Sequence, residues 1–238
     1  MNLESLRRAH SHRPIAYYAS IDSTMTAAAC LPRGAIVIAG EQTAGQGRHG
    51  HAWHSEANAG IYLSTVLDPG PVLTLAIGLA TVEAIAETTG IACDLRWPND
   101  VMLDDKKCAG ILVQLVDGLA IVGIGINVNH AAFPPAIAAE ATSLRIHKGA
   151  PLALEPIVEA LITAIDRYAD LPNEQVLDLF THASSYVRGR RVVVNQPTGD
   201  SAEIRGVTAG LDPAGFLKVR QDDGAVALIL AGGVRAAN

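Results

Sequence analysis

Two apolar segments joined by only two residues constrain the fold of this chain more than any other feature. Residues 108–116 and 119–128 are strongly apolar, and Asp117-Gly118 separates them. Asp-Gly between two strand-like segments indicates a tight hairpin turn. A shorter strand-like segment, 101–103, precedes them across another short polar connection, so a second hairpin is expected there. Consecutive hairpins predict an antiparallel or mixed sheet and not a repeated strand–helix–strand fold.

Other segments are expected to add strands and helices around this sheet. The segment 42–55 is polar and rich in glycine, which indicates a loop, and 130–150 is expected to be a surface excursion. The helix at 72–89 is expected to be amphipathic, with Glu83 and Glu87 on its polar stripe. Strands are predicted at 15–18, 35–40, 61–67 and 94–97, and helices at 2–12, 24–31, 72–89, 154–168 and 174–182.

The character of the chain changes after Val187. Short strands with closely spaced turn signals are typical of a small barrel. We therefore expect two domains, residues 1–185 and 186–238, and an α+β fold: a mixed, mainly antiparallel sheet with packed helices, followed by a small β-barrel. The strands are predicted at 191–195, 202–211, 216–219 and 225–230, and the turns between them at 197–199, 212–215 and 222–224.

The composition is that of a globular chain with a substantial core. Of its 238 residues, 49% are apolar and 18% charged, which argues against disorder. The net charge of −6 argues against a general affinity for nucleic acid, and no stretch is apolar enough for a membrane helix or a signal peptide. Cys30, Cys93 and Cys108 are far apart, so we expect free thiols in a reducing cytoplasm and neither a disulfide nor a zinc site.

The first segment with chemical content is the glycine-rich stretch 40–53, GEQTAGQGRHGHAW. Its G-x-G-x-x-G spacing matches a dinucleotide-binding fingerprint, but that fingerprint requires a helix to open at the loop. Here the chain returns to a strand at Ile61. A flexible glycine loop that carries Arg48 is better suited to fold over a phosphate-bearing ligand and exclude water.

Three histidines follow in the same loop. His49, His51 and His54 form H-x-H-x-x-H, a spacing that a metal site could use. Alternatively, histidines of a loop near an expected phosphate can be protonated for part of the time and then act as cations. We favour the second role and assign no metal ligand from the sequence.

The second segment is 96–100, Arg-Trp-Pro-Asn-Asp, with Lys107 seven residues after it. One interpretation is a tight turn in which Asn99 and Asp100 cap backbone groups, with Lys107 solvated on a hairpin. The other interpretation is a ligand site, because a tryptophan, an amide and a carboxylate are seldom packed together on a solvent-exposed surface. The segment alone leaves both open.

The third segment is 123–129, Gly-Ile-Gly-Ile-Asn-Val-Asn. Glycines inside a buried strand indicate close approach by a ligand or another backbone, and Asn127 would then end the strand facing that ligand. A core strand that merely tolerates glycine is the alternative.

Together and in this order, the segments resemble the catalytic core of biotin protein ligases. The resemblance covers roughly residues 15–185, and 187–238 resembles the small barrel that ends these enzymes. It implies a class II synthetase-like core with an SH3-like β-barrel. The motifs that carry it are Ile21-Asp-Ser-Thr24, Glu41-Gln-Thr-Ala-Gly-x-Gly-Arg48, Trp53, Trp97-Pro-Asn-Asp100, Lys107-x-Ala-Gly-Ile-Leu112, Gly125-Ile-Asn-Val128 and Thr142-Ser-Leu144.

The resemblance implies an ATP-dependent ligase that works in two steps. Biotin is activated as biotinyl-5'-AMP, and the biotinyl group then passes to a lysine of a biotin carboxyl carrier domain of a carboxylase. Mg²⁺ is expected to be carried with ATP, and a homodimer in the cytoplasm is expected from the family.

The resemblance also assigns roles to individual residues. Trp53 should pack on adenine, and Lys107 should bridge the biotin carboxylate and the adenylate phosphate. Asp100 is a candidate proton acceptor in the second step, and with Asn99 and Asn127 it should fix the nucleotide and Mg²⁺. The expected biotin-binding residues are Ser23, Thr24, Gln42, Gly45, Arg48, Lys107, Gly110, Leu112 and Gly125. The expected ATP or adenylate residues are Arg48, Trp53, Arg96, Asn99, Lys107 and Asn127, and the expected catalytic residues are Lys107, Arg48 and Asp100.

Five residues depart from the family pattern, among them His49 and His51, which occupy loop positions that are often basic. Met25 stands where asparagine commonly follows Ser-Thr, Gln46 replaces the first arginine of the loop, and Arg96 replaces the lysine before Trp-Pro-Asn-Asp. Because Gln46 removes one charge from the loop, we expect looser retention of the adenylate. These departures do not change the expected class of enzyme, but they leave its preference for one acyl substrate less well defined.

Three rival functions remain. A lipoate or octanoate ligase or transferase shares the fold, but the Gly-x-Gly-Arg loop and Trp-Pro-Asn-Asp favour biotin. A repressor that also ligates biotin needs an N-terminal DNA-binding domain of about 60 residues. Only some 14 residues precede the core, so DNA binding is not expected. A catalytically dead biotin-binding module is disfavoured because Arg48 and Lys107 are both present.

Overall fold

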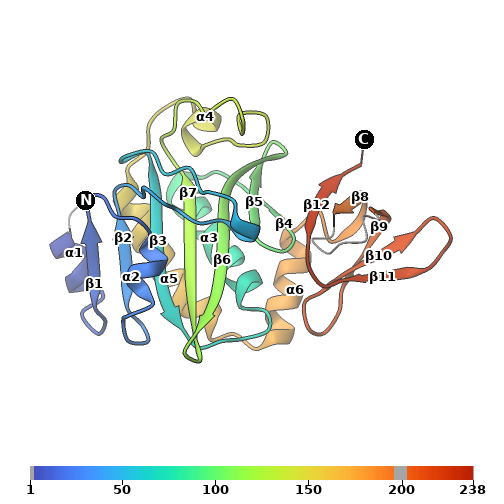
Figure 1. Ribbon diagram of the computed structural model, residues 1–238, viewed down its shortest axis with the longest axis horizontal. Helices are drawn as coiled ribbons and strands as arrows, with labels where there is room; N and C mark the ends of the chain where they lie inside the picture. The colour runs from blue at the N-terminus through green and yellow to red at the C-terminus, as the bar shows by residue number, and fades with distance from the viewer. Residues whose placement is uncertain (1–2, 196–202, 238) are drawn as a thin grey trace.

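The computed structural model describes residues 3–195 and 203–237 and contains two β-sheets (Figure 1). The larger sheet holds the first seven strands of the chain and the smaller one the last five. The strands of the larger sheet are β1 (Ile15–Tyr18), β2 (Ile36–Ala39), β3 (Gly60–Leu67), β4 (Asp94–Arg96), β5 (Asp100–Leu103), β6 (Lys106–Val116) and β7 (Leu119–Asn127). Those of the smaller sheet are β8 (Arg188–Asn195), β9 (Ile204–Leu211), β10 (Leu217–Gln221), β11 (Val226–Ile229) and β12 (Gly233–Ala236).

Tight hairpins organise the larger sheet. Its order is β1-β2-β3-β7-β6-β5-β4, and every pair is antiparallel except β1 with β2. At the β6–β7 turn Asp117 has φ 50° and Gly118 φ 81°, and at the β5–β6 turn Asp104 and Asp105 have φ 49° and 59°. Two successive positive φ angles match the twist of the flanking strands. The predicted mixed, mainly antiparallel sheet is confirmed, and the second connection is shorter than expected because Lys106 and Lys107 already belong to β6.

Helices cover the two faces of this sheet unequally. The long helices α3 and α5 pack on one face, while the short α2 lies on the other, against β2, β3 and β7 (Figure 1). Among the described residues, no helix is both long and apolar enough to cross a bilayer. The helices are α1 (Leu3–Ala9), α2 (Thr24–Ala28), α3 (Leu73–Thr89), α4 (Leu144–Lys148), α5 (Leu154–Ala169) and α6 (Asn173–Ala183).

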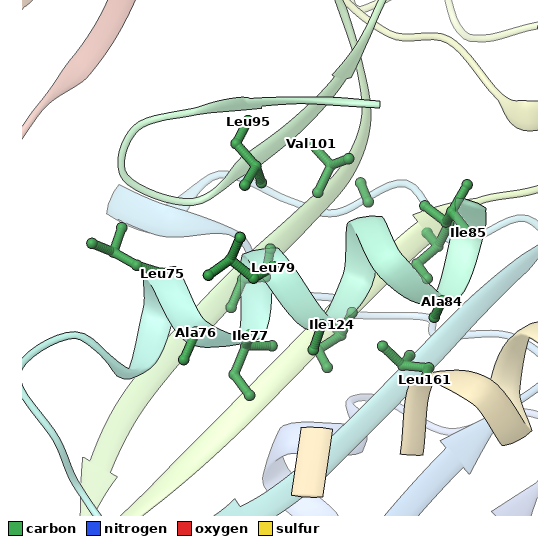
Figure 2. Close-up of a cluster of buried hydrophobic side chains, with 14 of the residues drawn as sticks. Leu75, Ala76, Ile77, Leu79, Ala84, Ile85, Leu95, Val101, Ile124 and Leu161 are labelled. Atoms are coloured by element: carbon green, nitrogen blue, oxygen red, sulfur yellow. The ribbon is translucent and has the colours of Figure 1, made fainter. Parts of the chain in front are cut away.

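The main hydrophobic core lies between the larger sheet and α3. Figure 2 shows Ile77 and Leu79 of α3 among strand side chains, with Leu161 of α5 beside the helix. The helix was expected to be amphipathic, with an apolar run before Glu83 and Glu87, and its first three turns are buried almost all round because the sheet, α5 and α6 enclose them. Its polar stripe is therefore limited to the half that carries Glu83 and Glu87.

A second, smaller core lies under α2 on the opposite face of the sheet. Met25 and Ala28 pack there on Val37, Val66 and Ile121. The same face continues along β6 and β7 beyond this small core. Because α3 and α5 occupy the other face, this continuation is free to form a ligand site.

Three elements differ from the sequence expectations. The helix expected at 24–31 ends at Ala28. The surface excursion 130–150 contains the short helix α4, whose N-cap Ser143 accepts a hydrogen bond from Ile146 N at 3.1 Å. The strand β12 was missed because its few residues lack a clear alternating pattern.

The C-terminal segment, where the strands of a small barrel were predicted, forms an antiparallel sheet of order β11-β10-β9-β8-β12. The turn expected at 197–199 lies outside the described residues. The sheet is tied to the rest of the chain by Trp97, whose Nε1 donates to Gly215 O at 2.9 Å. We propose a domain boundary between α6 and β8, close to the residue 185 expected from the sequence.

Leu161 tests the packing of α5 on α3. Leu161→Ala removes a fully buried side chain from the core, so the free energy of unfolding should fall by about 2–5 kcal/mol. Leu115→Ala is the matched control, because Leu115 is 71% exposed and its truncation should cost less than about 0.5 kcal/mol. Urea denaturation followed by circular dichroism measures both. Equal losses in the two variants would contradict the described core.

Candidate active site

A glycine floor marks the face of the larger sheet opposite α3. Gly110 of β6 pairs directly with Gly125 of β7, and Gly123 lies two residues before Gly125 on the same face. Two side chains rest on this floor. A Cβ on Gly125 would lie 2.3 Å from Cε2 of Trp53, and one on Gly123 would lie 2.6 Å from Sδ of Met25. The glycines of β7 are therefore required for close approach, as the sequence predicted for a ligand or backbone, and here they admit side chains.

A cavity of about 40 Å³ opens beside the floor. It has room for no more than a few water molecules, since each needs about 10–15 Å³ of such space. Most of the residues expected from the sequence meet there: Ser23, Thr24, Gln42, Arg48, Trp53, Asn99, Lys107, Gly110, Leu112 and Gly125. Four expected residues lie outside its lining: Gly45, Arg96, Asp100 and Asn127.

One wall of the cavity is a chain of hydroxyl and amide groups. Thr24 donates from both N and Oγ1 to Oε1 of Gln42, at 2.8 and 3.0 Å, and Gln42 Nε2 donates to Ser55 Oγ at 3.1 Å. Thr24 Oγ1 also contacts Ser64 Oγ of β3 at 2.8 Å. Ser23 Oγ is buried and has no hydrogen-bond partner among the described residues, which leaves it available to a ligand.

Ser64 was not identified from the sequence. It stands beside Thr65 in a strand whose other residues are mainly apolar and nearly all buried. The only signal was a hydroxyl in such a strand. Its position beside the cavity follows from the pairing of Ser64 with Gly123, which sequence reasoning could not supply.

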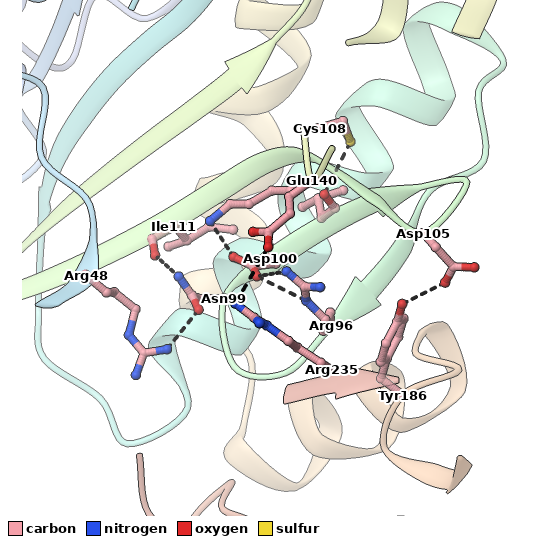
Figure 3. Close-up of polar contacts among 12 residues, drawn as sticks. Arg48, Arg96, Asn99, Asp100, Asp105, Cys108, Ile111, Glu140, Tyr186 and Arg235 are labelled. Atoms are coloured by element: carbon pink, nitrogen blue, oxygen red, sulfur yellow. Dashed lines mark hydrogen bonds and ion pairs between the residues drawn. The ribbon is translucent and has the colours of Figure 1, made fainter. Parts of the chain in front are cut away.

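The glycine-rich loop holds a cation over the cavity. Arg48 begins a single 3-10 turn, Arg48–Gly50, and its Nη1 donates to Asn99 Oδ1 at 3.0 Å and to Gly232 O at 3.3 Å. Asn99 is fixed in turn, because its Nδ2 donates to Ile111 O at 2.9 Å (Figure 3). Burial lowers the pKa of Arg48, and the nearby charge of Asp100 opposes that effect.

A second cation, Lys107, is held by a partly buried carboxylate. Lys107 Nζ lies 2.5 Å from Asp100 Oδ1, and Arg96 Nη2 lies 2.7 Å from Asp100 Oδ2 (Figure 3). Burial alone would raise the pKa of Asp100, but the charges and hydrogen bonds of Lys107 and Arg96 outweigh it and lower the pKa. Lys107 also lies 5.3 Å from the ring centroid of Trp53, a cation–π contact.

The remaining expected residues support the cavity from behind. Asn127 is buried, and its Nδ2 donates to Thr142 O at 3.1 Å. At Gly45 a Cβ would lie 2.9 Å from Ser55 Oγ, so the loop can pass the polar wall only with glycine there. Both residues shape the surroundings of the cavity without facing it.

The arrangement favours a ligand with three distinct parts. The glycine floor accepts an apolar body, the Ser23–Thr24–Gln42 wall can hydrogen-bond a polar head, and Arg48 and Lys107 attract an anionic end. No carboxylate is among the residues that line the cavity, and Asp100 behind it is paired with Lys107 and Arg96. Two cations beside one small cavity can also stabilise negative charge that develops during a reaction.

The sequence of this chain is similar to those of known biotin ligases. The sequence model of the Biotin/lipoate A/B protein ligase family matches residues 17–130. The chain is 32% identical over 231 residues to the biotin--[acetyl-CoA-carboxylase] ligase of Paracoccus denitrificans, covering 85% of this chain and 92% of that one. It is 32% identical over 207 residues to the bifunctional ligase/repressor BirA of Bacillus subtilis (strain 168), covering 81% and 63% respectively.

The fold is also that of a solved structure. The biotin protein ligase from Aquifex aeolicus, in complex with biotin and ATP, superposes with a TM-score of 0.84 at 29% identity. The match covers 94% of this chain and 99% of that one. The α+β class expected from the sequence is thereby confirmed, and the C-terminal strands expected for a small barrel form an antiparallel sheet.

Fold and site together define a member of the Biotin/lipoate A/B protein ligase family. Within it, the chain belongs to the biotin protein ligases. Its match spans 63% of the length of the Bacillus ligase/repressor.

The partly buried ion cluster of Asp100, Lys107 and Arg96 predicts a stability that depends on pH. At pH 7, Asp100→Asn should lower the free energy of unfolding by about 1–3 kcal/mol, because Lys107 and Arg96 lose their shared counter-ion. Since the pKa of Asp100 is lowered in the folded chain, its contribution is full above the ordinary pKa of about 3.9 and is lost as pH falls through the folded value.

Urea denaturation of wild type and variant between pH 7 and pH 3 measures this difference, which should shrink towards acid. Asp68→Asn is the matched control, since Asp68 pairs with Arg33 on the surface. This substitution should change the free energy of unfolding by less than about 1 kcal/mol at any pH. A loss of equal size at both ends of the pH range would contradict the described role of Asp100.

Proposed function

We propose that this chain is an ATP-dependent biotin protein ligase that joins biotin to a lysine of a biotin carboxyl carrier domain. The observation that carries the proposal is the meeting of Arg48 and Lys107 at one cavity with a glycine floor and a hydroxyl–amide wall. The names of the Paracoccus and Aquifex proteins, the second solved with biotin and ATP, support the choice of substrates.

In the proposed complex, the fused rings of biotin lie on the glycine floor. The urea group of biotin has one carbonyl and two N–H groups, which suit the wall of Ser23, Thr24 and Gln42. Ser23 Oγ supplies the unpaired hydroxyl, and Gln42 is already oriented by Thr24 and Ser55. The carboxylate of the biotin side chain then extends towards Lys107.

The first step forms the adenylate. A carboxylate oxygen of biotin attacks the α-phosphorus of ATP, the bond to the bridging oxygen breaks, and pyrophosphate leaves. Bringing a carboxylate against a triphosphate is opposed by charge repulsion. Arg48 and Lys107 offset that repulsion and stabilise the charge on the phosphorus oxygens and on the leaving pyrophosphate. Asn99, which accepts a hydrogen bond from Arg48, holds that guanidinium beside the cavity.

The second step transfers the biotinyl group. The carrier lysine amine attacks the acyl carbon, AMP leaves, and the amine loses a proton. Asp100 can accept a proton only when one of its cations leaves, because Lys107 and Arg96 occupy its two oxygens. Movement of Lys107 to the adenylate phosphate would free Oδ1 for this role. Asp100 thus serves first as the counter-ion that positions Lys107.

Trp53 must leave the floor for either substrate to bind. Its ring lies against Gly110 and Gly125, and the space beside it is only about 40 Å³. Once displaced, the ring can pack on adenine, and the loop that carries it can close over the adenylate. Closure protects an acyl phosphate that water would hydrolyse.

We also propose Mg²⁺ as the ion that accompanies ATP and neutralises its phosphates. The lining of the cavity offers amide oxygens and no carboxylate, and Asp100 behind it is already paired with two cations. These residues do not form a fixed magnesium site, so the ion would be held mainly by phosphate oxygens and water. The reaction is placed in the cytoplasm, where the three free thiols of this chain would stay reduced.

Mass spectrometry of a biotin carrier domain tests the proposal directly. After incubation with this protein, ATP and Mg²⁺, the carrier should gain the mass of one biotinyl group. Lys107→Ala should slow the gain at least about 100-fold because the charge that faces the reacting phosphate is lost. Lys106→Ala is the matched control, since the adjacent Lys106 is exposed and outside the cavity, and its activity should stay within twofold.

Lipoate offered in parallel separates the main rival, a lipoate or octanoate ligase or transferase. A gain with lipoate and none with biotin would replace the proposed function by that rival. The altered positions Met25, Gln46 and Arg96 would then be the first residues to restore to the family pattern.

Tryptophan fluorescence tests the displacement of Trp53. The chain has two tryptophans, and Trp97 is buried with its Nε1 bonded to Gly215 O. Biotin with ATP should change the emission of wild type and of Trp97→Phe to a similar extent, whereas Trp53→Phe should lose the change. A ligand-induced change that persists in Trp53→Phe would show that the ring on the glycine floor stays in place.

A further inference from the structure

A second group of polar side chains lies beside the active site and takes no part in the proposed reaction. His54 follows Trp53 on the loop, Glu56 lies two residues further, and His130 follows β7. Each offers one donor atom, and these atoms lie within 4.8 Å of one another. None of the three residues lines the cavity of the glycine floor.

The hydrogen bonds around Tyr62 determine which nitrogen of His130 is free. Tyr62 Oη has one proton and donates it to Glu56 O at 2.8 Å. Tyr62 Oη also lies 3.3 Å from His130 Nε2, so that nitrogen must carry the proton and donate to Tyr62. The lone pair of His130 is therefore on Nδ1. This atom is fully buried and has no hydrogen-bond partner among the described residues.

We infer that His54, Glu56 and His130 bind a divalent transition-metal ion of the zinc type. Two imidazole nitrogens and one carboxylate oxygen are ligands that zinc accepts, with water at the fourth position. Zinc ligands at about 2.0–2.2 Å from the ion are roughly 3.5 Å apart, so the cluster needs only a small closing movement. Glu56 can supply that movement because it is exposed and its side chain is free to turn.

The surroundings of His130 suit a metal ligand. A ligating histidine usually donates its other ring N–H to a neighbouring acceptor, and Tyr62 Oη provides that acceptor. Phe133 stacks on the His130 ring at 5.2 Å and meets the His54 ring edge-on at 6.3 Å, which fixes both rings and limits access of water.

The inferred ligands differ from the histidine set that the sequence suggested. His49, His51 and His54 share one loop, but the structure pairs His54 with His130, at 5.7 Å between ring centroids, and with Glu56. The side chain of His49 lies outside the described part of the chain. The bound ion would join the end of the glycine-rich loop to the segment after β7, and so would fix the chain directly after Trp53.

Metal titration tests the inference in the absence of biotin and ATP, so its failure leaves the proposed ligase activity untouched. The metal-free protein should bind one equivalent of Co²⁺ with visible absorption from nitrogen and oxygen ligands, and Zn²⁺ should displace it. His54→Ala and Glu56→Gln should each weaken binding at least tenfold. Both positions are at least partly exposed, so these variants should fold, which circular dichroism checks.

His51→Ala is the matched control. His51 is an exposed histidine of the same loop outside the cluster, and its loss should leave the affinity within twofold. Absence of stoichiometric binding by the wild-type protein would overturn the inference. So would an affinity that His54→Ala and Glu56→Gln leave unchanged, because the ion would then be bound elsewhere.

Discussion

The register between β6 and β7 is the constraint on which the rest of the site depends. The Asp117-Gly118 turn sets this register, and it places Gly110 directly opposite Gly125. A shift of one residue would turn every side chain of the strand to the other face. Bulky residues such as Ile124 would then lie on the floor, and the glycines would leave gaps in the core under α3.

Each cation of the site is held by a partner that a ligand can replace. Lys107 is paired with Asp100 and lies near the Trp53 ring, while Arg48 is hydrogen-bonded to Asn99. These contacts keep two positive charges close together without a bound anion. They also orient both groups before a phosphate arrives, which reduces the reorganisation needed during the reaction. The lowered pKa of Asp100 keeps this counter-ion charged throughout the neutral range.

Local rules made part of this structure predictable from sequence. Turn chemistry indicated the β6–β7 hairpin, and glycine inside a buried strand indicated close approach at Gly123 and Gly125. Long-range contacts decided the rest. Strand pairing places Ser64 behind the cavity, against Thr24, and His130 meets His54 across 76 positions of sequence, which no local pattern encodes. The resemblance named the residues of the site, but it did not predict that the Trp53 ring would fill the floor.

Two neighbouring residues, Trp53 and His54, have conflicting requirements for movement. In the proposed reaction Trp53 leaves the glycine floor when substrates bind, whereas the inferred metal site would hold His54 in a fixed position. The movement must therefore occur before His54, within the glycine-rich loop. The positive φ of Gly50, 77°, together with the nearby Gly45 and Gly47, gives this segment backbone freedom that residues with a side chain lack. An ion bound at His54 would make that residue the end of the hinge, so that opening of the loop leaves the adjoining strand β3 undisturbed.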